Sequence, residues 1–184
     1  PVQKKLLERL LKKYMTAPQT TSRTSSGWIG RGAFGFVMGF KIGRDYLAIK
    51  VTDVYDKNTF NKEVHYQKKL AKLNLAPQVY DHFIFEGNGV IIMDYLKDYV
   101  TRAELYRNLN QPYMRLIVKN LNKKINEILE VLILNKIYIS DVQIMIKKDL
   151  SDIKLIDFGL ARTISTPNKT NFYKQNMRDM LILG

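Results

Sequence analysis

The stretch "KLIDFGLAR" (residues 154–162) brings an acidic residue to the end of a short strand. Its apolar run is followed directly by Asp157, Phe158 and Gly159. A carboxylate at the end of a strand, beside a flexible glycine, is well placed to hold a metal ion. Upstream, "QIMI" (143–146) and the turn "KKDLSD" precede this strand, so the sequence predicts a small β-hairpin that presents Asp157.

Further upstream, the stretch "IGRGAFGFVMGF" (29–40) contains the glycines Gly30, Gly32 and Gly35 at G-x-G-x-x-G spacing. In a dinucleotide-binding fold, such glycines close a strand and open a helix. Here the following residues, "FVMGFKIG", alternate as a strand, which argues against that fold. We expect instead a glycine-rich loop between two antiparallel strands, where backbone N–H groups can approach phosphates because no side chains intervene.

A lysine, Lys50, ends the apolar strand segment that begins at Leu47. The next segment, 57–74, has helical periodicity and places Glu63 on an inward face. The residues that share this face are Phe60, Glu63, Gln67 and Leu70. An inward glutamate needs a partner, and Lys50 is the candidate. The alternative is an exposed glutamate beside a lysine whose charged end reaches solvent.

The remaining segments predict an α+β fold. Short β-prone runs over 28–54 form a meander, and 78–96 form a hairpin that turns at Gly87-Asn88-Gly89. Thr101 and Glu104 form a capping box that opens a short helix. A long apolar helix follows from Pro112 to about Lys136, and a helical tail covers 171–183.

These runs divide the chain into two lobes. Residues 2–15 read as an amphipathic helix, and residues 1–26 form this helix and a polar linker. A β-rich lobe with one main helix covers 27–96, and a reduced, mainly helical lobe covers 97–184. The helix over 2–15 could bind a membrane surface or nucleic acid, or pack against its own domain.

Composition limits the function classes. No apolar run is long enough for a transmembrane helix, and the charged N-terminal segment does not resemble a secretory signal. The absence of cysteine excludes disulfides and thiolate catalysis and favours a reducing, intracellular compartment. The net charge of +13 indicates a polyanionic partner, such as nucleic acid, nucleotide phosphates, an acidic protein or an anionic membrane. The alternative is a solvated, lysine-rich surface.

Taken in order, the glycine-rich loop, Lys50, Glu63 and the Asp-Phe-Gly at Asp157 resemble the motifs of the protein kinase superfamily. The resemblance implies ATP and Mg²⁺ as cofactors. Lys50 would hold the α- and β-phosphates and pair with Glu63, while Asp157 would bind Mg²⁺. It assigns the rest of the ATP site to Ile29, Gly30, Gly32, Gly35, Val37, Ala48, Met93 (the gatekeeper), Asp94 and Leu96.

The catalytic loop departs from the family's His-Arg-Asp-x-x-x-x-Asn pattern, since "YISDVQIMI" (138–146) stands in its place. Asp141 is the only acid between the long helix and the hairpin, so the resemblance makes it the catalytic base. Tyr138, Ile139 and Ser140 replace the usual lead-in, and the arginine that would meet a phosphorylated activation loop is missing, so regulation of that kind is not expected. Gln143 would replace the asparagine as second metal ligand. In an alternative alignment, Gln143 takes the place of a phosphate-contacting lysine and the metal position is apolar.

A second departure concerns the C-lobe. Only residues 160–184 follow Gly159, and they contain no Ala-Pro-Glu. The resemblance therefore implies a minimal, divergent kinase with a truncated C-lobe, of the atypical or viral kind, which a partner or a second copy could complete. A viral origin would place it in the host cytoplasm or the virion. Thr163, Ser165 and Thr166 would be candidate autophosphorylation sites.

The function implied is ATP-dependent transfer of the γ-phosphoryl group to Ser or Thr hydroxyls of a protein, with Asp141, Lys50 and Glu63 as catalytic residues and an acidic or nucleic-acid-associated protein as substrate. One alternative is a pseudokinase that binds nucleotide or a partner. The other is a small-molecule kinase of the same superfamily, for which the short tail leaves little material to build a substrate pocket.

Overall fold

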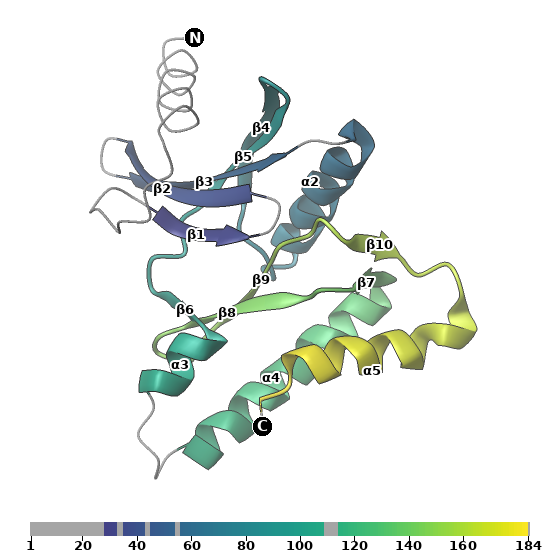
Figure 1. The fold of residues 1–184 in the computed structure, drawn as a ribbon. Helices are drawn as coiled ribbons and strands as arrows, with labels where there is room; N and C mark the ends of the chain where they lie inside the picture. Colours follow the sequence, from purple (N-terminus) through teal and green to yellow (C-terminus); the bar gives the residue numbers. More distant parts are fainter. Residues whose placement is uncertain (1–27, 33–34, 43–44, 54–55, 109–113, 184) are drawn as a thin grey trace.

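The computed structural model describes residues 28–32, 35–42, 45–53, 56–108 and 114–183 (Figure 1). The helix expected over 2–15, its linker and Pro112 lie outside the described residues. A β-sheet lies at one end of the molecule, and two long helices run side by side at the other. The structure is a mixed α+β fold, as the sequence predicts.

The larger sheet has five antiparallel strands in the order β1-β2-β3-β5-β4. Their bounds are β1 (Trp28–Gly32), β2 (Gly35–Ile42), β3 (Asp45–Asp53), β4 (Val79–Phe85) and β5 (Asn88–Asp94). The helix α2 (Lys57–Lys72) joins β3 to β4 and covers one face of the sheet. The apolar residues between this face and α2 include Ala48, Phe60, Val64, Ile91 and Met93.

The hairpin of β4 and β5 turns one residue earlier than predicted. Phe85 lies opposite Asn88, so the turn consists of Glu86 and Gly87, whose φ angles are 48° and 79°. Positive φ at both central residues is the geometry that matches the twist of the strands. Gly89 is instead in β5, where a Cβ would lie 2.4 Å from the ring of Phe60. Gly89 is therefore a glycine because it packs closely against Phe60, and not because it turns the chain. This is why the sequence prediction placed the turn one residue too late.

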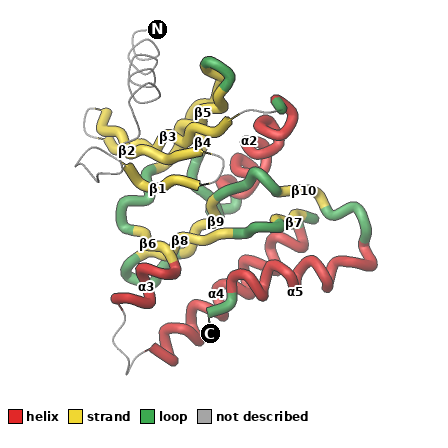
Figure 2. Tube along the Cα trace, viewed as in Figure 1, coloured by secondary structure: helices red, strands yellow, loops and turns green. Residues whose placement is uncertain are grey.

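The described residues from Tyr99 onward form a helical layer under two small sheets (Figure 2). The bounds of its helices are α3 (Arg102–Asn108), α4 (Met114–Leu134), the 3₁₀ turn η2 (Pro167–Lys169) and α5 (Thr170–Leu181). The strands are β6 (Tyr99–Thr101), β7 (Ile137–Ile139), β8 (Gln143–Lys147), β9 (Ile153–Ile156) and β10 (Ala161–Thr163). The predicted hairpin, short helix, long helix and tail are confirmed. The three-residue strands β6, β7 and β10 were not predicted.

The main core lies between α4, α5 and the small sheets. One face of α4 is buried through Leu121, Ile125, Ile128, Leu129 and Leu132, at helical spacing. This core continues through β7 to β9 as far as Phe158, which is 2% exposed. Within the described part of the chain, the search for helices long and apolar enough to span a membrane finds none.

Candidate active site

Lys50 is the centre of a charged cluster between α2 and the end of β9. It lies on β3, opposite Val37 of β2 and Ile91 of β5. Its Nζ is 2.5 Å from Glu63 Oε1 and 3.1 Å from Asp157 Oδ1. Burial alone would lower the pKa of Lys50, but the negative charges of Glu63 and Asp157 outweigh burial and raise it. The lysine is therefore held in its charged form.

The helix α2 presents Glu63 to this lysine. Asp56 caps the helix, since its carboxylate accepts hydrogen bonds from the N–H groups of Asn58 and Thr59. The predicted inward face is confirmed: Phe60, Glu63, Gln67 and Leu70 are all buried. Glu63 is 5% exposed and finds its partner in Lys50, so the alternative of an exposed glutamate is wrong.

Asp157 adopts a strained backbone conformation. Its φ is +64°, in the left-handed region that residues other than glycine rarely occupy. The chain is fixed on both sides of Asp157, by a hydrogen bond in the strand before it and by the burial of the residue after it. The N–H of Leu155 donates to the carbonyl of Leu75, and Phe158 is buried in the main core. Such strain persists where the surroundings enforce it, and it clusters at functional sites. Here it directs the Asp157 carboxylate to Lys50.

Asp141 lies in the turn between β7 and β8. Its carboxylate is unusual because one of its oxygens is buried without a hydrogen-bond donor in the described part of the chain. Its Oδ1 is buried and accepts no hydrogen bond from the described residues. Burial, and then the negative charge of Asp157, raise the pKa of Asp141, while Lys50 opposes the effect. A buried, unpartnered carboxylate oxygen costs free energy in the folded state. It is also available to a hydroxyl group or a cation that enters the site.

Gln143 is the first residue of β8 and is exposed. It lies opposite Ile156, the residue before Asp157. The described residues contain no group of three or more His, Cys, Asp or Glu side chains that could hold a metal by themselves. Mg²⁺ commonly uses one or two carboxylates and completes its octahedral shell with water and phosphate oxygens. Asp157 and Gln143 offer a carboxylate and an amide oxygen, which are ligand types that fit Mg²⁺.

The expected nucleotide-binding residues gather around the same strands. Gly32 lies opposite Gly35, and Gly30 lies opposite Val37, so β1 and β2 form the hairpin predicted for the glycine-rich loop. Ala48 lies opposite Met93, and both pack with Val37 on the face that α2 covers. The residues of the hairpin tip, 33 and 34, and the side chain of Ile29 lie outside the described part of the structure.

The strand β5 ends at the predicted hinge. The Met93 Sδ accepts a hydrogen bond from Gln67 Nε2 at 3.2 Å, which joins the expected gatekeeper to α2. Asp94 is held by β4 and the residue before it. Its N–H donates to the carbonyl of Gln78, and its carboxylate accepts from the N–H of Gln78 and from the hydroxyl of Tyr80 in β4. Leu96 follows, and its carbonyl accepts from the N–H of Tyr99.

Contacts that hold the segment after Gly159 were missed by sequence reasoning. The guanidinium carbon of Arg162 lies 5.0 Å from the centre of the Tyr138 ring and 5.7 Å from that of Tyr173. Tyr66 of α2 and Thr163 share a hydrogen bond of 2.7 Å between their hydroxyl oxygens. The signal available in the sequence was Tyr138, a large aromatic residue just before the catalytic loop.

Comparison with protein families agrees with this geometry. The family model of the protein kinase domain matches residues 24–178, which is most of the chain. The chain therefore belongs to the protein kinase family. At this coarse level, the match supports phosphoryl transfer as its chemistry. No curated protein matches the sequence closely enough to add a substrate or partner.

Proposed function

We propose that this protein is an ATP-dependent protein kinase that transfers the γ-phosphoryl group to Ser or Thr hydroxyls of a protein substrate. The observation that carries the proposal is the cluster in which Lys50 bridges Glu63 at 2.5 Å and Asp157 at 3.1 Å. A second carboxylate, Asp141, keeps a buried oxygen without a partner in the described residues. These groups can neutralise phosphates and accept a proton within one site.

In this proposal, Lys50 contacts the α- and β-phosphates, and Glu63 keeps the ammonium group in place. The backbone N–H groups around Gly30, Gly32 and Gly35 cover the phosphates. Asp157 and Gln143 would hold Mg²⁺, which supplies neutralisation of the charge that develops on the phosphoryl oxygens. The alternative alignment assigns Gln143 to a phosphate contact and leaves Asp157 as the main metal ligand.

The adenine ring would pack against the apolar side chains of Val37 and Ala48, with Met93 as the gatekeeper, and the family motif assigns Ile29 to the same site. Backbone groups from Asp94 to Leu96 would bind its polar edge. The packing of Val37, Ala48 and Met93 in one cluster supports this arrangement. These roles are those of the corresponding family motifs, carried over residue by residue.

Asp141 would orient the substrate hydroxyl and accept its proton as the bond to phosphorus forms. A base must be deprotonated to act, and the raised pKa of Asp141 makes its carboxylate a better proton acceptor than an ordinary aspartate. General-base catalysis contributes roughly 10²–10⁴-fold to such reactions. Most of the remaining rate enhancement comes from positioning and electrostatics, which the charged cluster around Lys50 provides.

The test is a radiolabelled γ-phosphate transfer assay with Mg²⁺ on the wild-type chain, Asp141→Ala and Asp157→Ala. The control is Asp149→Ala, which removes an exposed carboxylate from the turn between β8 and β9. Acceptors are matched peptides with Ser, Thr or Tyr at one position, in acidic and basic versions. We expect transfer to Ser or Thr that Asp149→Ala retains and the two site variants lose.

Thermal unfolding with and without ATP–Mg²⁺ separates the alternatives. Stabilisation by nucleotide without transfer to any peptide would support the pseudokinase. Transfer to Tyr alone would correct the acceptor. Equal transfer by all four proteins would refute the assignment of Asp141 and Asp157.

A further inference from the structure

The outward face of α2 carries a line of basic and polar side chains. Lys57, Asn61, His65, Lys68 and Lys72 follow one another at spacings of three or four residues, and all five are exposed. Residues at these spacings lie along one face of a helix. We name this line the α2 stripe. At a rise of 1.5 Å per residue, it is about 22 Å long.

The charge of the α2 stripe is not compensated by its own helix. The single carboxylate of α2 is Glu63, which is buried and paired with Lys50 on the opposite side. In the described part of the chain, Lys57, Lys68 and Lys72 form no ion pair with a carboxylate. These lysines therefore present a positive surface to solvent.

The groups around the α2 stripe change this charge little. Lys68 Nζ lies 3.4 Å from Nδ1 of His82, and burial followed by the charge of Lys68 lowers the pKa of that histidine. His82 is therefore a neutral neighbour at physiological pH rather than a counter-charge. Asp56 already accepts the N–H groups at the start of the helix. The charge of the adjacent Asp81 acts in the opposite direction on the pKa of His82 and is the smallest of the three influences.

We propose that the α2 stripe binds the phosphate backbone of nucleic acid. Phosphate contacts require cations and polar donors, which lysine, asparagine and histidine supply, and they need no apolar anchor. A protein partner would need an apolar or aromatic centre to its interface, and a membrane surface would need large apolar side chains on the helix. The α2 stripe has neither. Leu73, an exposed apolar residue, lies beyond the last residue of α2 and is not part of the stripe.

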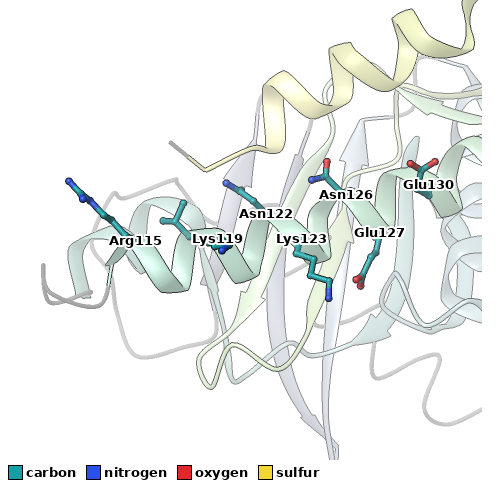
Figure 3. Close-up of a pocket in the computed structure, with 8 residues that line it drawn as sticks. Arg115, Lys119, Asn122, Lys123, Asn126, Glu127 and Glu130 are labelled. Carbon is teal, nitrogen blue, oxygen red and sulfur yellow. The ribbon is translucent and has the colours of Figure 1, made fainter.

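A second helix provides the comparison. The outer face of α4 borders a shallow hollow of about 730 Å³, and Figure 3 shows Arg115, Lys119 and Lys123 along it. Glu127 and Glu130 line the same hollow, but Glu130 is paired with Lys174 of α5, so Glu127 is the carboxylate of the hollow that can offset its basic residues. Three basic residues of the α4 face can be substituted while α2 is left unchanged. This face therefore provides a matched control for the α2 stripe.

The experiment measures the binding of a fluorescein-labelled single-stranded oligonucleotide by anisotropy, without ATP, over a range of salt concentrations. It compares the full wild-type chain with K57Q/K68Q/K72Q and with R115Q/K119Q/K123Q. Both variants lose three positive charges. We expect K57Q/K68Q/K72Q to bind about tenfold more weakly at physiological salt. Its slope of log K against log salt should fall in magnitude by about 2, because each single-strand phosphate contact contributes about 0.7.

The control R115Q/K119Q/K123Q should stay within about twofold of the wild type, and circular dichroism should show both variants folded. Equal weakening by both variants would overturn the proposal, because it would indicate non-specific attraction. Wild-type binding that is absent, or that is stronger for an acidic peptide or for phosphatidylserine vesicles, would also overturn it. Since the assay contains no ATP, this outcome is independent of phosphoryl transfer.

Discussion

The ion pair of Lys50 and Glu63 can be tested by a double-mutant cycle on stability. Lys50→Met leaves the carboxylate of Glu63 buried, at 5% exposure, without its cation. Removal of one partner from a buried pair costs about 3–5 kcal/mol. Glu63→Gln should cost less, about 2 kcal/mol. The reason is that Lys50 keeps Asp157 at 3.1 Å, and Asp157 is partly exposed.

The double variant should be more stable than the sum of the single effects predicts, because it removes both buried charges together. We expect a coupling energy of about 2 kcal/mol or more. The measurement is urea unfolding followed by circular dichroism, with the slope checked for two-state behaviour in each variant. Lys174 and Glu130 provide the comparison, since they form an ion pair on the surface between α5 and α4. Their cycle should give at most about 1 kcal/mol.

Two results would refute this reasoning. Additivity to within about 0.5 kcal/mol would mean that Lys50 and Glu63 do not stabilise each other. A larger loss for Glu63→Gln than for Lys50→Met would mean that Asp157 does not serve as the second partner of the lysine.

Three further predictions concern other parts of the chain. Asp141→Asn should lower the rate of transfer by about 10²–10⁴-fold yet unfold at higher urea. The folded state raises the pKa of Asp141, so ionisation of this carboxyl group destabilises the wild type as pH rises from the ordinary aspartate range through the raised pKa. The stability that Asp141→Asn gains over the wild type should therefore grow across that pH window and be absent below it. Thr101→Ala should cost about 1 kcal/mol in urea unfolding, since it removes the cap of α3 that Thr101 and Glu104 form reciprocally; an unchanged midpoint would contradict this. Gly89→Ala should cost about 2 kcal/mol, because its Cβ would overlap the buried ring of Phe60; a truncated ring, Phe60→Leu, should relieve part of that cost.

The sequence was sufficient where the interactions are local or periodic. The inward face of α2 follows from helical spacing, and the need of a buried glutamate for a partner led to Lys50. The hairpin that presents Asp157 follows from two β-prone runs and a turn. In each case, the residues that determine the structure lie within one element, or a single requirement, such as a partner for a buried charge, determines the contact.

The sequence was insufficient where several elements meet or where two turns compete. The run from Glu86 to Gly89 contains two glycines, and only the packing of Gly89 against Phe60 decides which of them turns the chain. The strands β6, β7 and β10 have three residues each, and each pairs with a partner far away in sequence. Such short segments have no periodicity to detect.

The segment after Gly159 is held by contacts that require no phosphate. Arg162 of β10 lies opposite Tyr138 of β7, and its guanidinium group packs on the Tyr138 ring. Thr163 is bound to Tyr66 of α2 through their hydroxyl groups. The same helix carries Glu63 one turn earlier, so α2 contacts both this segment and Lys50. These contacts form in the unmodified chain, and a phosphate on Thr163 would disrupt its hydrogen bond with Tyr66.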